Sequence, residues 1–445
     1  MNASEELANF INSTSYPDLP GLVVEKAKLS ILDALGAAIA GRASQAGGIV
    51  ASFVKEVWGG DEATVLTGGS SSAIGAALAN GYLANALDID DGGKYTRGHP
   101  GAQIIPVTLA LGEKYGKTGS EVILATVVGY ETAHRVAGCW HEKYEEYRAC
   151  GSWGSVASAA AAASLINLGK EAKKNALRIA DYNSPYLPMK RAIDQPSMVK
   201  HGTGWGAMTG IISAEWAKRG FTGPSVPFDG ASCNRWFADL GQRFIMAEKD
   251  GVEFKEIPSC SWGHPPIKAA MELVDRHEVE VDRIEKVVVE GFSEMAALCQ
   301  EVPSTEEEAQ FSVKWPMAVA LVDGKVRPAA MSKERFSDRE LKNLFDKIEV
   351  KESEELTRMN EVLSERGGET SAWPSRVKII SENGRTVRSG TVKSKPAKIA
   401  SFTALVEKFE RLTKEVLGKK RMKEVIAGVK SFENLKQVET LTALL

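Results

Sequence analysis

The segment from residue 86 to residue 101 holds the residues of this chain that are best suited to acid–base chemistry. Three aspartates stand within four positions, and an arginine and a histidine follow them: Asp88, Asp90, Asp91, Arg97 and His99. Glycines interrupt the segment, and apolar runs at 74–87 and 102–111 flank it, which predicts a charged loop between two buried helices. Carboxylates and cations held together at the edge of a core acquire shifted pKa values, and such groups can move protons.

The aspartates admit one structural and three functional interpretations. Spacing alone favours capping of a loop or helix, and Asp91 suits that role. A Mg²⁺ site would use carboxylate ligands, but Lys94, Arg97 and His99 would compete for them. A proton donor to a hydrocarbon needs an aromatic-rich cavity, whereas aromatic residues make up only 7% of the chain. Acid–base chemistry on an anionic substrate fits best, because the cations can bind the substrate while an aspartate or His99 moves a proton.

Later polar breaks supply further candidates. Lys200 and His201 separate two apolar, helix-like stretches, and Lys255 lies in a loop that ends at His264. Each lysine could be an ordinary surface residue, since most lysines are exposed. His264 precedes two prolines and could equally begin a helix.

Helices must bring these separate segments together. Within the first 270 residues, small and apolar residues recur at helical spacing over 22–40, 121–136, 155–168 and 204–218. Their alanines and glycines let helix axes approach closely, which favours a dense helical core. No G-x-G-x-x-G motif follows a strand-like run and no P-loop is present, so a nucleotide-binding fold has little support.

The character of the sequence changes near residue 278. Residues 283–290 and 347–350 are typical of strands, and strand-like runs at 376–380 and 386–388 flank Asn383-Gly384, a strong hairpin signal. A helical period returns from Ser401. We therefore predict a mainly α protein. A large all-α helical domain spans 1–270 and is completed by 400–445, and a smaller inserted α/β lid domain spans 271–399.

Composition excludes several classes of function. The 445 residues include 55 basic and 58 acidic ones, a balance that predicts no nucleic-acid partner. No signal peptide and no apolar run long enough for a bilayer are visible, so no membrane partner and a cytoplasmic location are expected. The five cysteines are odd in number and form no C-x-x-C pair, which predicts reduced thiols and no structural zinc.

Taken in order along the chain, these motifs resemble those of the MmgE/PrpD family, which includes 2-methylcitrate dehydratase, iminodisuccinate epimerase and cis-aconitate decarboxylase. No motif is decisive alone, but their order and spacing cover almost the whole sequence. The matching segments are Asp33-Ala34-Leu35-Gly36, Leu87-Asp88-Ile89-Asp90-Asp91, His99-Pro100-Gly101, Gly129-Tyr130-Glu131 with Arg135, Lys200-His201-Gly202, Gly220-Phe221-Thr222-Gly223-Pro224, Phe254-Lys255, Pro258-Ser259-Cys260, His264-Pro265 and Ala309-Gln310-Phe311-Ser312.

The resemblance implies the same two-part fold and a homodimer. It also implies that Asp88 belongs to the site and that Lys255 binds a substrate carboxylate. Lys200 matches a second carboxylate-binding lysine of the family. His201, the next residue in the same loop, is kept as a further candidate for that position.

The chain departs from the cis-aconitate decarboxylase pattern at several positions. Arg148 and Cys260 stand where those enzymes have histidines, Trp315 where they have a tyrosine, and Gly92 where they have a threonine. An arginine can bind a carboxylate through two hydrogen bonds but is a poor neutral proton shuttle. These differences argue against decarboxylation.

We expect an enzyme that removes a proton α to a carboxylate of a small di- or tricarboxylate, without a redox cofactor or metal. Asp88 and His99 are the expected acid and base, in an order that the sequence leaves open. The residues expected to bind substrate are Arg97, Arg148, Lys200, His201, Lys255, Cys260 and His264. The favoured reaction is that of a hydro-lyase resembling 2-methylcitrate dehydratase. The alternatives are epimerisation of an imino- or amino-dicarboxylate, then decarboxylation, and a catalytically silent binding homologue.

Overall fold

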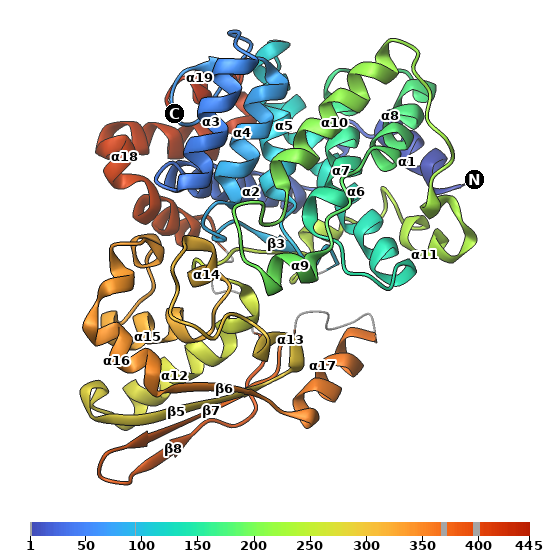
Figure 1. The fold of residues 1–445 in the computed structure, drawn as a ribbon. Coiled ribbons are helices and arrows are strands. Elements are labelled where there is room, and N and C mark those ends of the chain that lie inside the picture. The colour runs from blue at the N-terminus through green and yellow to red at the C-terminus, as the bar shows by residue number, and fades with distance from the viewer. Residues whose placement is uncertain (1, 94, 366–371, 395–400) are drawn as a thin grey trace.

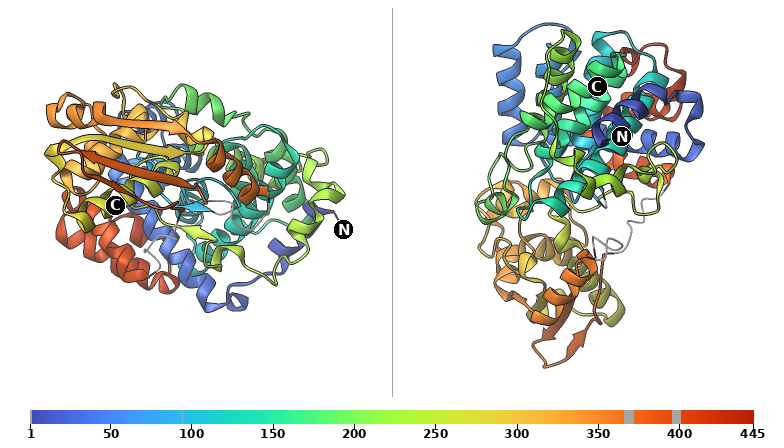
Figure 2. Two further views of the ribbon diagram at one scale, coloured as in Figure 1. Left: turned by 90° about the horizontal axis from the view of Figure 1, so that it is seen from below. Right: turned by 90° about the vertical axis from the view of Figure 1, so that its right-hand side faces the viewer.

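The computed structural model describes residues 2–93, 95–365, 372–394 and 401–445, so Lys94 lies outside the described residues. Figure 1 shows a large helical body above a smaller body that is built on one sheet. Both chain ends lie on the helical body (Figure 2). The arrangement confirms the predicted fold class, mainly α with a smaller α/β part.

The helical body contains every helix that the sequence predicts in the first 270 residues. Thr118 caps the helix α6, because its hydroxyl accepts from the Glu121 N–H while the Glu121 carboxylate accepts from the Thr118 N–H. The helices are α1 (Ala3–Ser13), α2 (Gly21–Gly41), α3 (Gln45–Val57), α4 (Ala73–Asn85), α5 (Gly101–Lys114), α6 (Gly119–Lys143), α7 (Cys150–Leu165), α8 (Lys170–Tyr182), α9 (Met189–Asp194), α10 (Thr203–Lys218) and α11 (Asn234–Phe237). Two short strand pairs accompany them: β1 (Ala63–Thr64) with β2 (Ser70–Ser71), and β3 (Gly92–Gly93) with β4 (Val252–Glu253).

Small residues bring the central helices α7 and α10 together. A Cβ added to Gly210 of α10 would lie 2.2 Å from Cβ of Ser158 in α7, so only glycine permits this approach. Nearly all of α7 is buried. The alanine-rich sequence therefore forms the close-packed helical centre that carries the loops of the site.

The smaller body is a four-stranded sheet with helices packed against it. The strand order is β6 (Ile348–Glu352), β5 (Ile284–Gly291), β7 (Ser375–Ser381) and β8 (Thr386–Arg388), with β5 parallel to β6 and the other pairs antiparallel. Gly384 turns the β7–β8 hairpin with a φ of 81°, a conformation that favours glycine. The helices are α12 (His264–His277), α13 (Ser293–Ala296), α14 (Glu306–Gln310), α15 (Lys314–Asp323), α16 (Arg339–Lys347) and α17 (Glu354–Glu365).

The helix α18 (Phe402–Lys430) follows the smaller body in the sequence and packs against α2 of the helical body (Figure 1). The short helix α19 (Glu439–Thr442) comes after it. One hydrophobic core accordingly joins residues 3–254 with residues 405–441. A second core runs through 257–387 and includes Ala149, Met189 and Ile193 from the helical body. The domain bounds 1–270 with 400–445 and 271–399 stay predictions.

Two cysteines are paired, which corrects the expectation that all five are reduced. Cys139 of α6 and Cys233, which precedes α11, form a disulfide with their Cα atoms 5.5 Å apart. They stand 94 positions apart in the chain, so counting and local spacing could not reveal the pair. Cys150, Cys260 and Cys299 are free.

Among the described residues, no helix combines the length and the apolar character that crossing a bilayer requires.

Candidate active site

The predicted charged loop joins α4 to α5, and both helices are almost wholly buried. Asp88 has a φ of 51° and Arg97 a φ of 47°, and Lys200, in a separate loop, has a φ of 41°. Left-handed backbone is unfavourable for residues other than glycine and persists where the surroundings hold it. The loops that carry the predicted site residues are thus fixed in unusual conformations.

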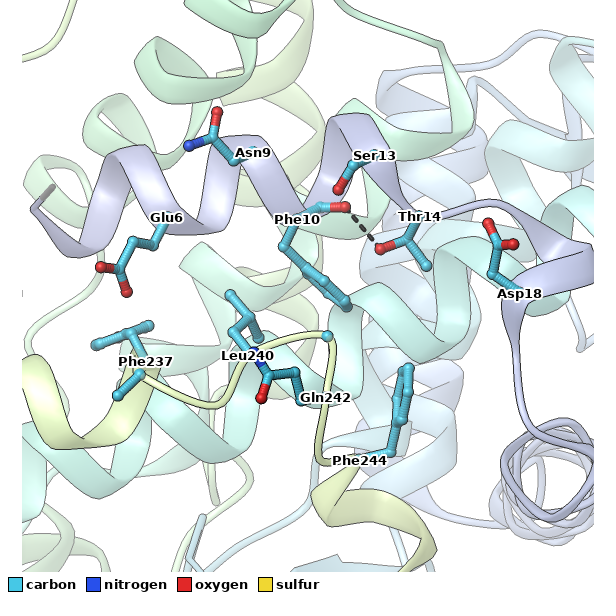
Figure 3. Close-up of a pocket in the computed structure, with 12 residues that line it drawn as sticks. Glu6, Asn9, Phe10, Ser13, Thr14, Asp18, Phe237, Leu240, Gln242 and Phe244 are labelled. Carbon is cyan, nitrogen blue, oxygen red and sulfur yellow. Dashed lines mark hydrogen bonds between the residues drawn. The ribbon is translucent and has the colours of Figure 1, made fainter.

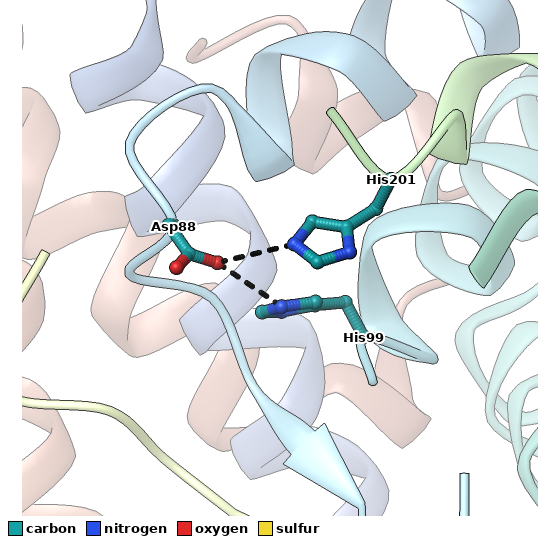
Figure 4. Close-up of side chains that lie close together, drawn as sticks. All are labelled: Asp88, His99 and His201. Atoms are coloured by element: carbon teal, nitrogen blue, oxygen red, sulfur yellow. Dashed lines mark ion pairs between the residues drawn. The ribbon is translucent and has the colours of Figure 1, made fainter. Parts of the chain in front are cut away.

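His99 lies between two carboxylates. Its Nε2 is 3.1 Å from Asp88 Oδ1 and its Nδ1 is 3.1 Å from Asp90 Oδ2. Its backbone N–H donates to the thiol sulfur of Cys150 at 3.2 Å, which fixes the start of α5 against α7. The structure therefore joins the predicted acid–base residues Asp88 and His99 directly (Figure 4). It also adds Asp90 as a third member.

The charges in this cluster are fixed by its neighbours. Burial opposes ionisation of Asp88, but Lys255, His99 and Lys200 together hold the pKa of its carboxyl well below the usual range. Burial also opposes a charge on His99, yet the carboxylates of Asp90 and Asp88 raise its pKa to about 9. At neutral pH the pair is an aspartate and an imidazolium.

His201 completes the cluster in the opposite protonation state. Its Nε2 is 3.8 Å from Asp88 Oδ1, and its ring centroid is 4.6 Å from that of His99 (Figure 4). Burial, together with the positive charge of His99, places the pKa of His201 well below its ordinary value. Two histidines thus meet at one carboxylate, one charged and one neutral.

Lys255 reaches the same carboxylate from a distant part of the chain. Its Nζ is 3.0 Å from Asp88 Oδ2, and both side chains are almost completely buried. The pairing of Gly92 with Glu253 between β3 and β4 brings the two segments together. A buried ammonium beside a carboxylate supplies a fixed positive charge to the site.

Lys200 faces the end of α4 rather than Asp88 directly. Its ammonium donates to the carbonyls of Asn85 at 2.6 Å and Ala86 at 3.2 Å, and to Gln310 Oε1 at 2.5 Å. Helix C-terminal carbonyls favour such a cation. Lys200 therefore lies at the site with its hydrogens already engaged.

Asp91 turns away from the cluster and has the capping role that the sequence suggests. Its Oδ1 accepts from the N–H of Gly101, the first residue of α5, at 3.0 Å, and its Oδ2 accepts from the Tyr130 hydroxyl at 2.6 Å. A Cβ on Gly101 would lie 2.6 Å from the Tyr130 oxygen, which explains the glycine after His99-Pro100. Burial and the charge of Asp33 raise the pKa of Asp91 to about 8.

Two of the other predicted substrate-binding residues lie beside the cluster. Burial, with the charge of Asp88, raises the pKa of the Cys260 thiol to about 12, so the thiol is neutral. His264 is the first residue of α12 and lies 3.0 Å, Nε2 to carbonyl oxygen, from Ser259. Burial and the charge of Lys255 lower the pKa of His264 to about 3.

The two predicted arginines point elsewhere. The guanidinium of Arg148 lies over the rings of Tyr144, Tyr186 and Trp140, at 4.2, 5.1 and 5.5 Å from their centroids. Arg97 is exposed, and its carbonyl accepts a hydrogen bond from the Tyr147 hydroxyl. The structure brings five of the predicted residues together in one cluster: Asp88, His99, Lys200, His201 and Lys255.

The cluster can be examined as a metal site, because ligand atoms of Asp88, His99 and His201 lie within 4.8 Å of one another. A cation there would meet the ammonium of Lys255, 3.0 Å from Asp88, and the imidazolium of His99. The three residues therefore fit an anion better than a metal ion. Asp91, which a Mg²⁺ site of the three loop aspartates would need, faces Tyr130 and Gly101 instead.

Asp88 Oδ1 and His99 Nδ1 are engaged in the ion pairs of the cluster, whereas the buried Nδ1 of His201 makes no hydrogen bond with a described residue. Buried polar groups are normally paired, so this ring nitrogen is free to meet a bound group. A cavity of about 540 Å³ lies elsewhere, between α1 and the segment 237–244, and none of the predicted site residues lines it (Figure 3).

Sequence reasoning missed three residues that shape the site. Gln310 stands in a recognised motif but carried no role, and Cys150 and Tyr147 carried no signal of their own. Tyr147 fixes the loop at Arg97, and Cys150 fixes it at His99. These two contacts form only when the segment 147–150 packs against the charged loop.

The protein is mainly α and has two parts, and the cluster gathers buried acidic and basic side chains between them. The MmgE/PrpD N-terminal domain matches residues 5–239, and the MmgE/PrpD C-terminal domain matches residues 257–431. The chain belongs to the MmgE/PrpD family, as its motifs indicated.

Several relatives are similar to this chain over nearly their whole length. Cis-aconitate decarboxylase of Homo sapiens is 24% identical over 472 residues, which cover 99% of this chain and 94% of the relative. Cis-aconitate decarboxylase of Aspergillus terreus is 24% identical over 490 residues, which cover 99% of this chain and 95% of the relative.

Proposed function

We propose that this protein is an enzyme that removes a proton α to a carboxylate of a small di- or tricarboxylate, in a hydro-lyase reaction resembling that of 2-methylcitrate dehydratase. The observation that carries the proposal is the convergence of two histidine rings, 4.6 Å apart, on one buried carboxylate that also pairs with Lys255. Elimination of water needs a base and an acid at once, and a neutral and a charged imidazole supply both.

The roles follow from the charges of the two rings. His201, neutral with an unpaired Nδ1, accepts the α-proton as the C–H bond breaks. His99, charged, gives a proton to the β-hydroxyl as the C–O bond breaks and water leaves. One ring gains the proton that the other loses, so the total charge beside Asp88 is the same before and after the reaction.

The lysines stabilise the charge that develops on the substrate. Removal of an α-proton moves negative charge onto the carboxylate oxygens, and fixed cations in a buried site stabilise that charge without having to reorganise. Lys255 and Lys200 supply two such cations, and the expected cofactor-independent reaction requires no further group. We propose no direct substrate contact for Arg148, whose guanidinium lies over three aromatic rings.

Decarboxylation is the second candidate, because the relatives named above are cis-aconitate decarboxylases. That reaction needs cations for the carboxylates and an acid that protonates the carbon after CO₂ leaves, and His99 could be that acid. It leaves the neutral His201 without a task. Epimerisation would use the same base and return the proton to the opposite face.

One experiment separates these reactions. Purified protein is incubated in D₂O with a panel of carboxylates, including 2-methylcitrate and cis-aconitate, and followed by proton NMR. The proposal predicts deuterium exchange at an α-carbon together with an alkene product. CO₂ release from cis-aconitate without α-exchange in the hydroxylated acids would replace it with decarboxylation, and inverted stereochemistry without an alkene would indicate an epimerase.

We also propose that the chain forms a homodimer, as the family resemblance implies. Large apolar side chains are exposed on and beside α10, namely Trp205, Trp216 and Phe221, and α3 exposes Ile49 and Phe53. Exposed aromatic side chains of this kind suit a subunit interface, where such residues are enriched. Light scattering should give twice the chain mass of 48.0 kDa, and a single-chain mass would refute the dimer.

A further inference from the structure

Gln310, the last residue of α14, lies where the smaller body meets the loops of the site. Its side chain is fully buried. Its Oε1 accepts from Lys200 Nζ at 2.5 Å and its Nε2 donates to the Ala86 carbonyl at 3.1 Å. Its own carbonyl accepts from the Cys260 N–H at 2.8 Å. One residue thus contacts three segments of the site, two through its side chain and one through its backbone carbonyl.

Among the residues that the structure describes, Gln310 provides the one acceptor for Lys200 that comes from the smaller body. The other two hydrogens of the ammonium go to the carbonyls of Asn85 and Ala86 at the end of α4. All three acceptors are neutral oxygens, so these bonds orient the ammonium without neutralising its charge. A carboxylate in place of the amide would instead pair with the lysine and cancel that charge.

The next residue along the chain makes a parallel contact. Phe311 packs its ring 5.9 Å from the ring of His201, centroid to centroid, at an interplanar angle of 37°. Two consecutive residues of the smaller body therefore meet the two consecutive residues Lys200 and His201 of the helical one. Both contacts join the end of α14 to the loop that precedes α10.

We propose that Gln310 is a positioning residue for Lys200: it holds the ammonium at the end of α4 and so makes the charge of the site depend on docking of the smaller body. The effect on substrate rests on the proposed function, in which the positive charge of Lys200 stabilises a substrate carboxylate. The hydrogen bond between Gln310 and Lys200 does not depend on that function. The two parts can therefore be tested separately.

The test is a double-mutant cycle with Lys200→Met, Gln310→Met and the double variant. Calorimetry with citrate, a simple tricarboxylate, measures binding. If Gln310 acts through Lys200, Gln310→Met weakens citrate binding about tenfold in the wild-type background and less than about twofold in the Lys200→Met background. Equal losses in both backgrounds would overturn the proposal, because Gln310 would then act independently of the lysine.

The same four proteins are compared by thermal melting without any ligand. We expect the double variant to lose less in melting midpoint than the two single variants lose together, because each single variant strands a buried partner. Additive losses would also overturn the proposal. If wild-type protein fails to bind citrate but melting shows coupling, the proposed carboxylate site is refuted for citrate while the positioning role stands.

Gln300 provides a matched control in the same body. Its Nε2 donates to the carbonyls of Ala296 and Leu298, and it does not touch Lys200. Gln300→Met should be additive with Lys200→Met in both measurements. If Gln310→Met does not fold, Gln310→Glu keeps the shape of the side chain. It should weaken citrate binding at least tenfold at neutral pH, and unchanged binding would contradict the positioning role.

Discussion

Asp88 and Asp91 belong to one short loop, but the two sides of that loop are different electrostatic environments. The side that carries Asp88 meets Lys255, His99 and Lys200, which keep the carboxyl ionised. The side that carries Asp91 faces the helical core, where Tyr130 is the hydrogen-bond donor and Asp33 is a like charge that raises the pKa. Both carboxyls are buried, so burial alone does not distinguish them.

The difference comes from residues that are distant in the sequence. On the core side, Lys408 of α18 pairs with Asp33 and donates to the Ile89 carbonyl at 2.7 Å, which fixes the loop from behind. On the other side, Lys255 and His201 arrive from two further segments. We infer that the side of the loop that carries Asp88 takes part in the reaction. The side that carries Asp91 holds the loop in place.

The largest expected effect is on turnover. His99→Ala and Asp88→Asn should each lower turnover by about 10²–10⁴-fold with the fold intact, because each removes a group at the reacting centre. Asp91→Asn, the matched change on the other side of the loop, should cost less than about tenfold. Rates within a few-fold of wild type in both site variants, or an equal loss in Asp91→Asn, would contradict the inferred difference between the two sides of the loop.

The next effect is on substrate binding. Lys255→Ala should weaken citrate binding by about ten- to a hundredfold, since a charge-assisted contact is worth roughly 1.5–3 kcal/mol, and should affect acetate less. Lys268→Ala serves as the control, because Lys268 pairs with Glu256 at the surface. Equal losses for citrate and acetate would show that Lys255 does not read a polycarboxylate.

A smaller effect is expected in the pH dependence of stability. The folded pKa of Asp91, about 8, lies above its ordinary value of 3.8, so the native state retains a proton that the unfolded state releases. Stability from this group is present below about pH 4 and is lost as pH rises towards 8, at no more than about 1.4 kcal/mol per pH unit. Asp91→Asn should remove that slope, so its stability relative to wild type should improve with rising pH. Parallel curves for the two proteins would contradict the raised pKa.

The smallest expected effect is that of chelation. Activity should change less than about twofold on dialysis against EDTA, because Lys255 and His99 already occupy the cationic positions around Asp88. Activity that is lost on dialysis and restored by Mg²⁺ or Zn²⁺ would revive a metal at Asp88, His99 and His201.

Local patterns predicted much of the fold. The loop between α4 and α5, the β7–β8 hairpin at Asn383-Gly384 and the return of α18 all follow from periodicity and turn residues. A capping role for Asp91 was also suggested by its place in the loop, and the residue that it caps, Gly101, stands ten positions further along the chain. These features depend on interactions within short stretches of chain.

The missing parts depend on contacts between distant segments. The bond from Lys200 to Gln310 spans 110 positions, and the disulfide of Cys139 and Cys233 spans 94. Arg148 was expected at the substrate, and the sequence did not predict that its guanidinium lies over aromatic rings, above all that of Tyr144. Composition and spacing do not contain such information, because it arises only when the helices pack.

The most direct test of the account is the charge of the two site histidines. The chain has only six histidines, so ¹⁵N labelling of their rings gives a spectrum that His99→Gln and His201→Gln can assign. We predict that His99 is an imidazolium at pH 7 and loses its proton near pH 9, whereas His201 is neutral at pH 7. A neutral His99 or a charged His201 at pH 7 would contradict this prediction.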